Sequence, residues 1–341
     1  MRNNNSEIEI IKFLNSKFNL KHKDRGIKYE KSKRLILTDK YTTLFNIRRK
    51  TPLGFKFLKL LKVKNNNLLI FKDTVTIESL NGYVFLNIKE NLFIKVIENK
   101  FNNSVSKNFD LVTKFYSNLV IEELKLMESD NFTFIYSHFL DHKLLQEHQE
   151  DYRKSLNKAL SINSENIEEV SFSEYYKMIT KNLQIERTSP QLNGIRLELI
   201  SQLKEFQNTN RSVFLKFSHG DLSANNFMFT KNKIYLIDWE NSGIFNFIYD
   251  YIVLEFYSSD FTFWEKVSKN VFDFRYSSIL EENIRDLKKF DSDIKINQSD
   301  IYLSLIELFI LNINRYDNNK DIDEGVQFLS KIIKIVKILN D

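Results

Sequence analysis

The chain of 341 residues contains no cysteine, two prolines and seven glycines. Without cysteine it can form no disulfide, thiolate nucleophile or cysteine-ligated zinc site. No stretch of 18 consecutive apolar residues occurs, so the sequence indicates no membrane-spanning helix. Residues 1–18 also lack the apolar core of a signal peptide. The default expectation is therefore a cytoplasmic location, with the inner face of the membrane left open as an alternative.

What the chain does contain is typical of a soluble globular protein, with 42 % hydrophobic and 28 % charged residues. Its length allows one large domain or two lobes around a cleft. The sequence shows no internal repeat and no linker rich in proline or serine. Two lobes that share a cleft explain this better than independent domains do.

The net charge of +5 is unevenly distributed. Residues 1–72 hold about 19 Lys and Arg against about 5 Asp and Glu, a net of roughly +14, which leaves roughly −9 for residues 73–341. Lysines alternate with Phe and Leu over residues 54–64. This pattern most often belongs to a solvated helix, and peripheral contact with an anionic membrane is the alternative. No nucleic-acid motif accompanies the basic residues, so a nucleic-acid partner is not favoured.

The polar residues that carry chemistry are concentrated in residues 217–257. His219, Asp221 and Asn226 stand in the pattern His-x-Asp-x-x-x-x-Asn, and Asp238 ends the apolar run 234–237. An apolar strand at 213–215 precedes the loop, and a hairpin of strands 226–229 and 233–237 follows it. This order brings the polar groups to one end of the hairpin.

Such a set of side chains suits phosphoryl transfer. The reaction needs a carboxylate that orients or deprotonates the acceptor hydroxyl, and oxygen ligands for the magnesium that neutralises the phosphates. Asp221, Asn226 and Asp238 supply these groups. Taken alone, an Asp and an Asn in one loop more often indicate turn chemistry or helix capping.

Over these roughly 40 residues the sequence resembles the aminoglycoside phosphotransferase and choline kinase family, distant relatives of protein kinases. The segment His219-Gly220-Asp221-Leu222 to Asn226 is similar to the family's catalytic loop, and Ile237-Asp238-Trp239-Glu240 to its metal-binding strand end. The resemblance implies that Asp221 is the catalytic base and that Asn226 and Asp238 bind Mg²⁺. It gives His219 and Asp250 structural roles.

The same resemblance implies the fold class, α+β. We expect a bilobal protein-kinase-like fold with a small antiparallel-sheet N-lobe and a larger, mostly helical C-lobe. The predicted division is a basic, partly helical N-terminal extension at 1–72, the N-lobe and hinge at 73–139, and the helical lobe with the catalytic loop at 140–341.

Within the predicted N-lobe, strands at 83–88 and 92–97 carry Lys95, which is similar to the family's phosphate-contacting strand lysine. Alternation places Lys95 on one face with Phe93 and Ile97; an exposed edge-strand lysine is the alternative. Asp110, on a helix predicted at 104–119, lies where the family places a glutamate that pairs with this lysine. A solvated helix charge is the other interpretation of Asp110.

A strand predicted at 131–140 leads to the hinge, which in this family presents backbone groups to adenine. We therefore expect Ser137, His138 and Phe139 to contact the nucleotide. ATP is the expected cofactor together with Mg²⁺, and GTP stays open because backbone recognition leaves little side-chain signature.

The remaining elements are mostly helices. Their predicted ranges are 7–18, 151–160, 171–183, 189–207, 251–257, 261–270, 299–314 and 324–339, with a charged stretch at 281–293 and a loop or exposed arm at 21–34. Pro190 after Ser189 is a typical helix start.

The predicted function is an ATP- and Mg²⁺-dependent phosphotransferase that acts on a hydroxyl of a small molecule, sugar or surface glycan. The acidic balance of 73–341 would suit a cationic acceptor such as an aminoglycoside or choline. The basic and apolar segment 331–338 favours the sugar or glycan instead. A non-catalytic kinase-like scaffold or regulator is the alternative from another class.

Overall fold

The structure is a computed structural model that describes residues 4–23, 25–31, 34–38, 61–64, 69, 71–78, 82–87, 89–99, 105–120, 124–138, 149–161, 167–185, 187, 189–203, 212–223, 226–229, 234–274, 276–288, 295–317 and 322–340. The chain divides into two compact units. Unit 1 comprises Met1–Ser106, Val120–Gln149 and Met228–Leu236, and unit 2 comprises Lys107–Leu119, Glu150–Phe227 and Ile237–Asp341.

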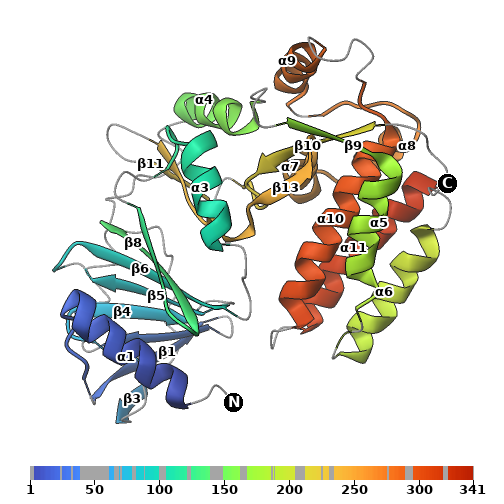
Figure 1. Cartoon of the computed structure of the whole chain (residues 1–341). Helices are drawn as coiled ribbons and strands as arrows, with labels where there is room; N and C mark the ends of the chain where they lie inside the picture. Colours follow the sequence, from blue (N-terminus) through green and yellow to red (C-terminus); the bar gives the residue numbers. More distant parts are fainter. Residues whose placement is uncertain are drawn as a thin grey trace. The chain divides into compact units, whose positions relative to one another are not determined.

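Unit 1 is built on one antiparallel sheet in the order β3-β1-β2-β4-β5-β6-β8-β7 (Figure 1). Every described pairing between neighbouring strands is antiparallel. The strands are β1 (Arg25–Lys31), β2 (Arg34–Thr38), β3 (Leu61–Lys64), β4 (Thr74–Glu78), β5 (Gly82–Asn87), β6 (Leu92–Glu98), β7 (Lys125–Glu128) and β8 (Phe132–His138).

Helix α1 (Asn4–Phe18) packs on one face of this sheet. Its apolar residues recur at helical spacing, and Ile10 and Leu14 join the buried cluster of strand side chains that includes Ile94. The ring of Phe13 stacks on that of Phe134, with centroids 3.7 Å apart. Each large apolar side chain buried in this way contributes about 1.5–3 kcal/mol to folding. The core of unit 1 therefore lies between helix α1 and strands β5, β6 and β8.

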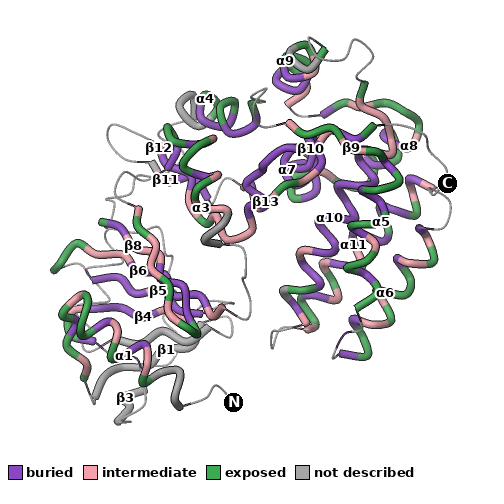
Figure 2. The backbone as a smooth tube through the Cα atoms, viewed as in Figure 1, coloured by how far each residue is buried: buried purple, intermediate pink, exposed green. Residues whose placement is uncertain are grey.

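Unit 2 is mostly helical and contains a three-stranded sheet in the order β13-β10-β9. Figure 2 shows β10, α7 and α10 largely in the colour of buried residues. The strands are β9 (Ile167–Ser171), β10 (Ser212–Ser218) and β13 (Gly243–Asn246). The helices are α3 (Val105–Phe115), α4 (Gln149–Leu160), α5 (Phe172–Leu183), α6 (Pro190–Gln202), α7 (Tyr249–Ser258), α8 (Phe261–Ser268), α9 (Ser277–Leu287), α10 (Gln298–Asp317) and α11 (Ile322–Asn340).

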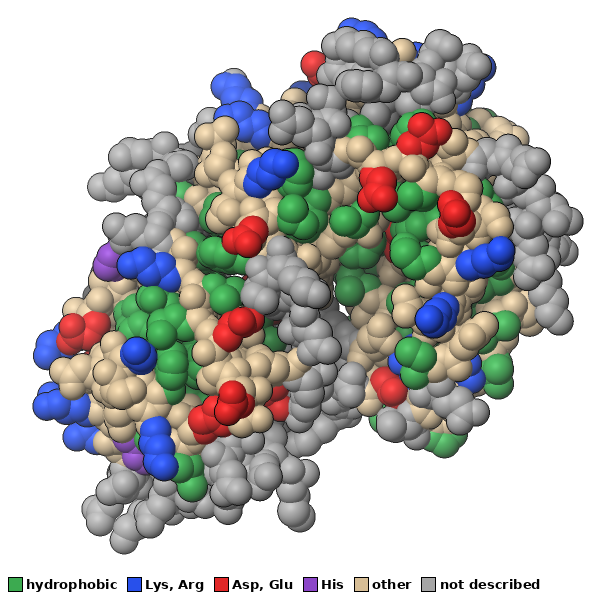
Figure 3. Space-filling view, viewed as in Figure 1, with side chains coloured by type: hydrophobic (Ala, Val, Ile, Leu, Met, Phe, Trp, Pro, Cys, Tyr) green, Lys and Arg blue, Asp and Glu red, His purple; other side chains and the backbone are tan. Residues whose placement is uncertain are grey.

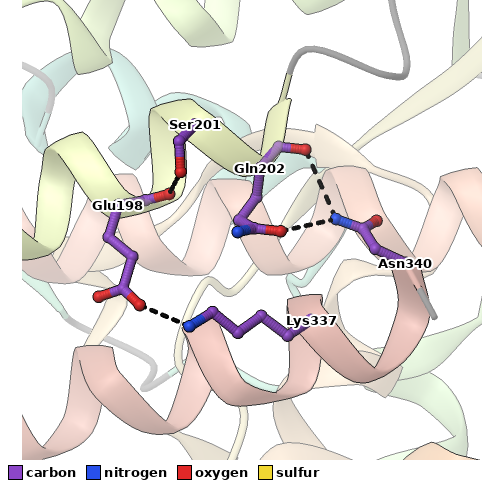
Figure 4. Close-up of polar contacts among 5 residues, drawn as sticks. All are labelled: Glu198, Ser201, Gln202, Lys337 and Asn340. Atoms are coloured by element: carbon purple, nitrogen blue, oxygen red, sulfur yellow. Dashed lines mark hydrogen bonds and ion pairs between the residues drawn. The ribbon is translucent and has the colours of Figure 1, made fainter.

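A short two-stranded sheet, β11 (Phe227–Phe229) with β12 (Ile234–Leu236), follows the loop after β10 in the chain. Within unit 2, α6 and α11 are joined by polar contacts (Figure 4). Lys337 forms an ion pair with Glu198 at 2.7 Å, and the Asn340 side-chain amide donates to Gln202 Oε1 at 3.2 Å. Among the helices that the structure describes, none is long and apolar enough to span a membrane.

The α+β class and the antiparallel sheet predicted for the smaller part of the chain are confirmed. Each predicted helix and strand of residues 73–341 has a counterpart, and Ser189 caps α6 with Pro190 in its first turn. The predicted loop at 21–34 is wrong, because β1 and part of β2 occupy it. Its dense charge obscured the alternation of Ile27 and Tyr29 between polar residues, which is a strand pattern.

The predicted boundary at residue 72 does not coincide with a boundary between the units. Strand β2 pairs with β4, with Leu37 opposite Thr76, so residues on both sides of position 72 share one sheet. The solvated helix favoured for residues 54–64 is wrong for Leu61–Lys64, which form strand β3, and residues 54–60 lie outside the described residues. On the face drawn in Figure 3, Lys and Arg side chains are interspersed with Asp and Glu. Most basic side chains of 1–72 are not among those described, and the membrane contact stays a prediction.

Candidate functional site

The site in unit 2 begins where β10 ends. Residues of β10 alternate across the small sheet, and the strand runs directly into His219, Gly220 and Asp221. Gly220 has a φ of +83°, in the left-handed region. A Cβ at this position would lie 1.9 Å from the carbonyl oxygen of Asn241. Only glycine allows this turn, because both the backbone conformation and the close approach exclude a side chain.

His219 is fully buried and joins the loop to the end of the following hairpin. Its Nε2 lies 2.8 Å from the carbonyl oxygen of Ile237, and its Nδ1 accepts a hydrogen bond from the Asp221 N–H at 3.3 Å. These two contacts together fix the neutral tautomer with the proton on Nε2. The structural role predicted for His219 therefore has a geometric basis: it orients Asp221 and the segment that carries Asp238.

Asp250 holds the loop from the other side. It lies in the first turn of α7 and is fully buried, and its two carboxylate oxygens accept the N–H groups of His219 and Gly220, each at 3.3 Å. A carboxylate near a helix N-terminus is favoured by the helix dipole, and charge-assisted hydrogen bonds are stronger than neutral ones. Asp250 thus holds the backbone of the loop, and the structural role that the resemblance implies for it stays a prediction.

Asn226 and Asp238 complete the arrangement. The Asn226 side-chain amide donates to the carbonyl oxygen of Asp221 at 2.6 Å, and the backbone carbonyl oxygen of Asn226 accepts the Ile237 N–H at 2.8 Å. Asp238 is exposed and adopts φ 65° and ψ 47°, a left-handed conformation in which its side chain does not cap the following short helix. Backbone strain of this kind at an exposed carboxylate is common at functional sites.

The donor atoms of Asn226 and Asp238 fit Mg²⁺. The Nδ2 group of Asn226 donates to the Asp221 carbonyl oxygen, so the Oδ1 atom of the same amide points away from that oxygen. Asp238 contributes a carboxylate. Oxygen ligands of these two kinds are those that Mg²⁺ prefers. Among the described residues, no group of three or more His, Asp and Glu could hold a metal by itself.

Two residues of the site were missed by the sequence interpretation. The hydroxyl of Tyr249, the first residue of α7, donates to the carbonyl oxygen of Gly220 at 3.3 Å. The hydroxyl of Tyr116 donates to the carbonyl oxygen of Phe217 at 2.9 Å, and its ring centroid lies 4.9 Å from that of Trp239. No spacing rule indicates such contacts, because both tyrosines also look like ordinary core residues.

A buried cation on β10 was also missed. Lys216 is 1 % exposed, and its Nζ donates to the carbonyl oxygen of Leu160, the last residue of α4, at 3.2 Å. Burial lowers the pKa of Lys216, and the negative charge of Asp250 opposes that shift. The side-chain amide of Asn283 donates to the same Leu160 oxygen at 2.9 Å. A positive charge at a helix C-terminus is favourable, so Lys216 ties α4 to the strand that carries the loop.

The predicted nucleotide residues Lys95 and Ser137 lie in unit 1. Lys95 is 8 % exposed on β6, which pairs with β5 and β8 and is therefore not an edge strand. Because its neighbours Ile94 and Val96 belong to the cluster under α1, alternation places Lys95 on the opposite face of the sheet. The alternative of an exposed edge-strand lysine is wrong, and the contact of Lys95 with phosphates stays a prediction.

The hinge residues lie at the end of β8. Ser137 is buried and donates to the carbonyl oxygen of His138 at 3.1 Å, whereas the His138 side chain is exposed. Phe139 lies outside the described residues. Asp110 is exposed on α3 in unit 2, and its pairing with Lys95 of unit 1 stays a prediction.

Comparison with known proteins places this site in a family context. Residues 133–289 match the model of the ecdysteroid kinase-like family. This segment contains the loop from His219 to Asn226 together with Asp238 and Asp250. The resemblance to kinase-like phosphotransferases is thereby confirmed. No curated protein shows a significant match to the chain.

Solved structures of small-molecule kinases are also similar. An aminoglycoside phosphotransferase from Streptomyces rimosus is 12 % identical, with 67 % of this chain and 88 % of that chain covered and a TM-score of 0.40. An ethanolamine kinase from Plasmodium vivax is 12 % identical, with 77 % and 79 % covered and a TM-score of 0.41. A choline/ethanolamine kinase family protein from Mesorhizobium loti is 12 % identical, with 88 % and 95 % covered and a TM-score of 0.38.

Proposed function

We propose that this kinase-like protein is an ATP- and Mg²⁺-dependent phosphotransferase whose acceptor is a hydroxyl group of a small molecule, sugar or surface glycan. The observation that carries the proposal is the loop from His219 to Asp221, whose backbone is held by the buried side chains of Asp250, Asn226 and Tyr249. A loop fixed in this way presents one carboxylate, that of Asp221, in a constant direction. Positioning of this kind is the main contribution a protein makes to phosphoryl transfer.

In this proposal Asp221 orients the acceptor hydroxyl and takes its proton, because it is the partly exposed carboxylate of the loop. Asn226 and Asp238 would hold Mg²⁺, which neutralises phosphate charge when bound. Lys95 would contact the ATP phosphates, and residues around Ser137 and His138 the adenine. GTP is an alternative donor, since the expected contacts come from the backbone.

The name of the matched family, ecdysteroid kinase-like, supports a small-molecule acceptor in this proposal. A lipid-linked or membrane-bound acceptor is a further proposal that the net positive charge of residues 1–72 supports. Co-sedimentation with vesicles of anionic and of neutral lipids tests it, and equal binding to both would count against it.

The metal site is tested by replacing Asp238 with Asn, which tolerates the left-handed backbone that Asp238 adopts. We expect calorimetry to show Mg²⁺-dependent binding of a non-hydrolysable ATP analogue to the wild-type protein and at least about tenfold weaker binding to Asp238→Asn. Asp73→Asn is the matched control, because Asp73 also has a left-handed backbone, with a φ of 56°. Equal binding by all three proteins would remove the assignment.

A further inference from the structure

Most polar backbone groups of the loop His219–Asp221 have an identified hydrogen-bond partner. The N–H groups of His219 and Gly220 donate to Asp250, the Asp221 N–H donates to His219 Nδ1, and the Asp221 carbonyl oxygen accepts from Asn226. The side chains in all four of these bonds belong to residues of the predicted motif, His219, Asn226 and Asp250. The carbonyl oxygen of Gly220 is bonded instead by the hydroxyl of Tyr249, at 3.3 Å.

This bond acts on the peptide group that leads into Asp221. The Gly220–Asp221 peptide has two polar ends: its carbonyl oxygen bonds Tyr249, and its N–H bonds His219 Nδ1. Gly220, with its φ of +83°, lacks the steric restriction that a side chain would impose. The two hydrogen bonds, one at each end, therefore oppose rotation of the peptide plane, and that plane sets the direction of the Asp221 side chain.

Tyr249 is itself held firmly. It is fully buried at the start of α7, and its ring stacks on Phe245 of β13 with centroids 4.3 Å apart and an interplanar angle of 14°. Burial raises the pKa of Tyr249, and the nearby negative charges of Asp250 and Asp221 raise it further. The hydroxyl thus keeps its proton at neutral pH and stays a donor to the Gly220 carbonyl oxygen.

We propose that Tyr249 is a positioning residue of the phosphotransferase: its hydroxyl fixes the Gly220–Asp221 peptide and thereby the direction of the Asp221 carboxylate. This inference rests on the proposed function for its catalytic consequence. Its structural part, the restraint of the peptide by the hydroxyl, is independent of what the protein phosphorylates.

The test compares Tyr249→Phe with Tyr251→Phe. Both tyrosines lie on α7, and they are 0 % and 1 % exposed. Tyr251 is the matched control because its hydroxyl accepts a hydrogen bond from the Asn283 side chain at 2.6 Å and is not bonded to the loop. Each variant keeps its aromatic ring and loses one buried hydroxyl bond, so both are expected to fold.

We expect Tyr249→Phe to lower kcat about 10- to 100-fold while the KM for the nucleotide stays within about twofold, because the loop is misdirected and nucleotide contacts are kept. Tyr251→Phe should leave kcat within about twofold of wild type. A merely structural role of Tyr249 would instead give the same kcat in both variants, and that result would overturn the proposal.

Amide hydrogen exchange of the peptide covering residues 217–223 provides a readout that needs no substrate. Exchange in this peptide should be about tenfold faster in Tyr249→Phe than in wild type and unchanged in Tyr251→Phe. If the wild-type protein transfers no phosphate, the proposed function fails, and this measurement still decides whether Tyr249 restrains the loop. Equal exchange in wild type and Tyr249→Phe would refute that restraint.

Discussion

Gly220 is the residue on which the geometry of the loop depends most directly. It separates His219 from Asp221, adopts a left-handed backbone and lies against the carbonyl oxygen of Asn241. A larger residue would have to displace the segment that follows Asp238. The need for glycine at this position is thus a consequence of packing between the loop His219–Asp221 and the segment that follows Asp238.

Replacing Gly220 with Ala should lower the free energy of unfolding by at least about 1–2 kcal/mol, the cost of a left-handed conformation for a residue with a Cβ. Gly194→Ala is the control: Gly194 lies inside α6, and a Cβ there would meet no atom within 4 Å. That substitution should raise stability by about 0.5–1 kcal/mol. Urea denaturation of the three proteins measures both effects, and equal stability of Gly220→Ala and wild type would contradict the strain argument.

Glu307 on α10 gives the protein a pH-dependent stability. It is 4 % exposed and accepts the backbone N–H of Asn246 at 2.9 Å. Burial raises its pKa well above the ordinary value of 4.5, and the hydrogen bond opposes that shift. Between pH 4.5 and the raised pKa, the folded protein keeps a proton that the unfolded chain releases. The contribution of Glu307 to the free energy of unfolding is therefore complete below pH 4.5 and declines as the pH rises through this window.

Glu307→Gln keeps the acceptor and removes the titration. We expect the free energy of unfolding of the wild type, relative to the variant, to fall as the pH is raised from 4.5 towards 8. Urea denaturation at a series of pH values measures this difference. A difference that is constant with pH would show that Glu307 titrates normally.

At the residue scale, residue type and spacing predicted the chemistry of Asp221, Asn226 and Asp238, and the resemblance to kinases implied the structural roles of His219 and Asp250. His219, Asp221, Asn226, Asp238 and Asp250 form an ordered motif, and the structure links them by hydrogen bonds or along the short segment after Ile237. Tyr249 and Lys216 could not be predicted in the same way. Their roles depend on which backbone carbonyl each one meets, and that is decided by packing between distant segments.

At the element scale, a buried arginine of α6 binds the C-terminal end of α5. Arg196 of α6 is 6 % exposed, and its Nη1 donates to the carbonyl oxygen of Leu183, the last residue of α5, at 2.7 Å. A cation at a helix C-terminus is stabilised by the unpaired carbonyl groups there. The ion pair of Lys337 with Glu198 also contacts α6, but these side chains are 47 % and 45 % exposed (Figure 4).

Loss of these two contacts should lower the free energy of unfolding by different amounts. Arg196→Met should lower the free energy of unfolding by about 2 kcal/mol or more, since it removes a buried hydrogen bond from a charged group. Lys337→Met should cost less than about 1 kcal/mol, because exposed ion pairs contribute little. Thermal or urea unfolding separates the two. A larger loss for Lys337→Met than for Arg196→Met would contradict this ranking.

Elements were predictable where one face is apolar and the period is clear, as for α1, β5 and β6. Strand β1 was missed because charged residues dominate it and local composition indicates a loop. Strand β2 was missed because its sequence, RLILT, is a short apolar run without a clear period. Strand β13 was missed because it has four residues, too few to establish a period. Its position is fixed by pairing with β10, an interaction between segments that no local pattern records.

At the scale of the whole molecule, the predicted machinery is divided between the two units. Lys95, Ser137 and His138 belong to unit 1, whereas Asp221, Asn226 and Asp238 belong to unit 2. The proposed function therefore predicts that a variant of either unit affects the same reaction. Lys95→Met should lower kcat/KM for the nucleotide about tenfold or more, through weaker phosphate contact. Steady-state kinetics at varied nucleotide concentration measures this, and an unchanged kcat/KM would remove Lys95 from the site.

The central claim, that Asp221 is the catalytic carboxylate of a phosphotransferase, is tested most directly by Mg²⁺-dependent transfer of the γ-phosphate. The acceptors to compare are sugars, lipid-linked glycans, sterols, aminoglycosides, choline and a generic protein, each with ATP and with GTP. We predict transfer to one small-molecule or glycan class by the wild type, and a rate at least about 100-fold lower for Asp221→Asn. Undiminished transfer by Asp221→Asn, or nucleotide binding without transfer to any acceptor, would contradict this assignment.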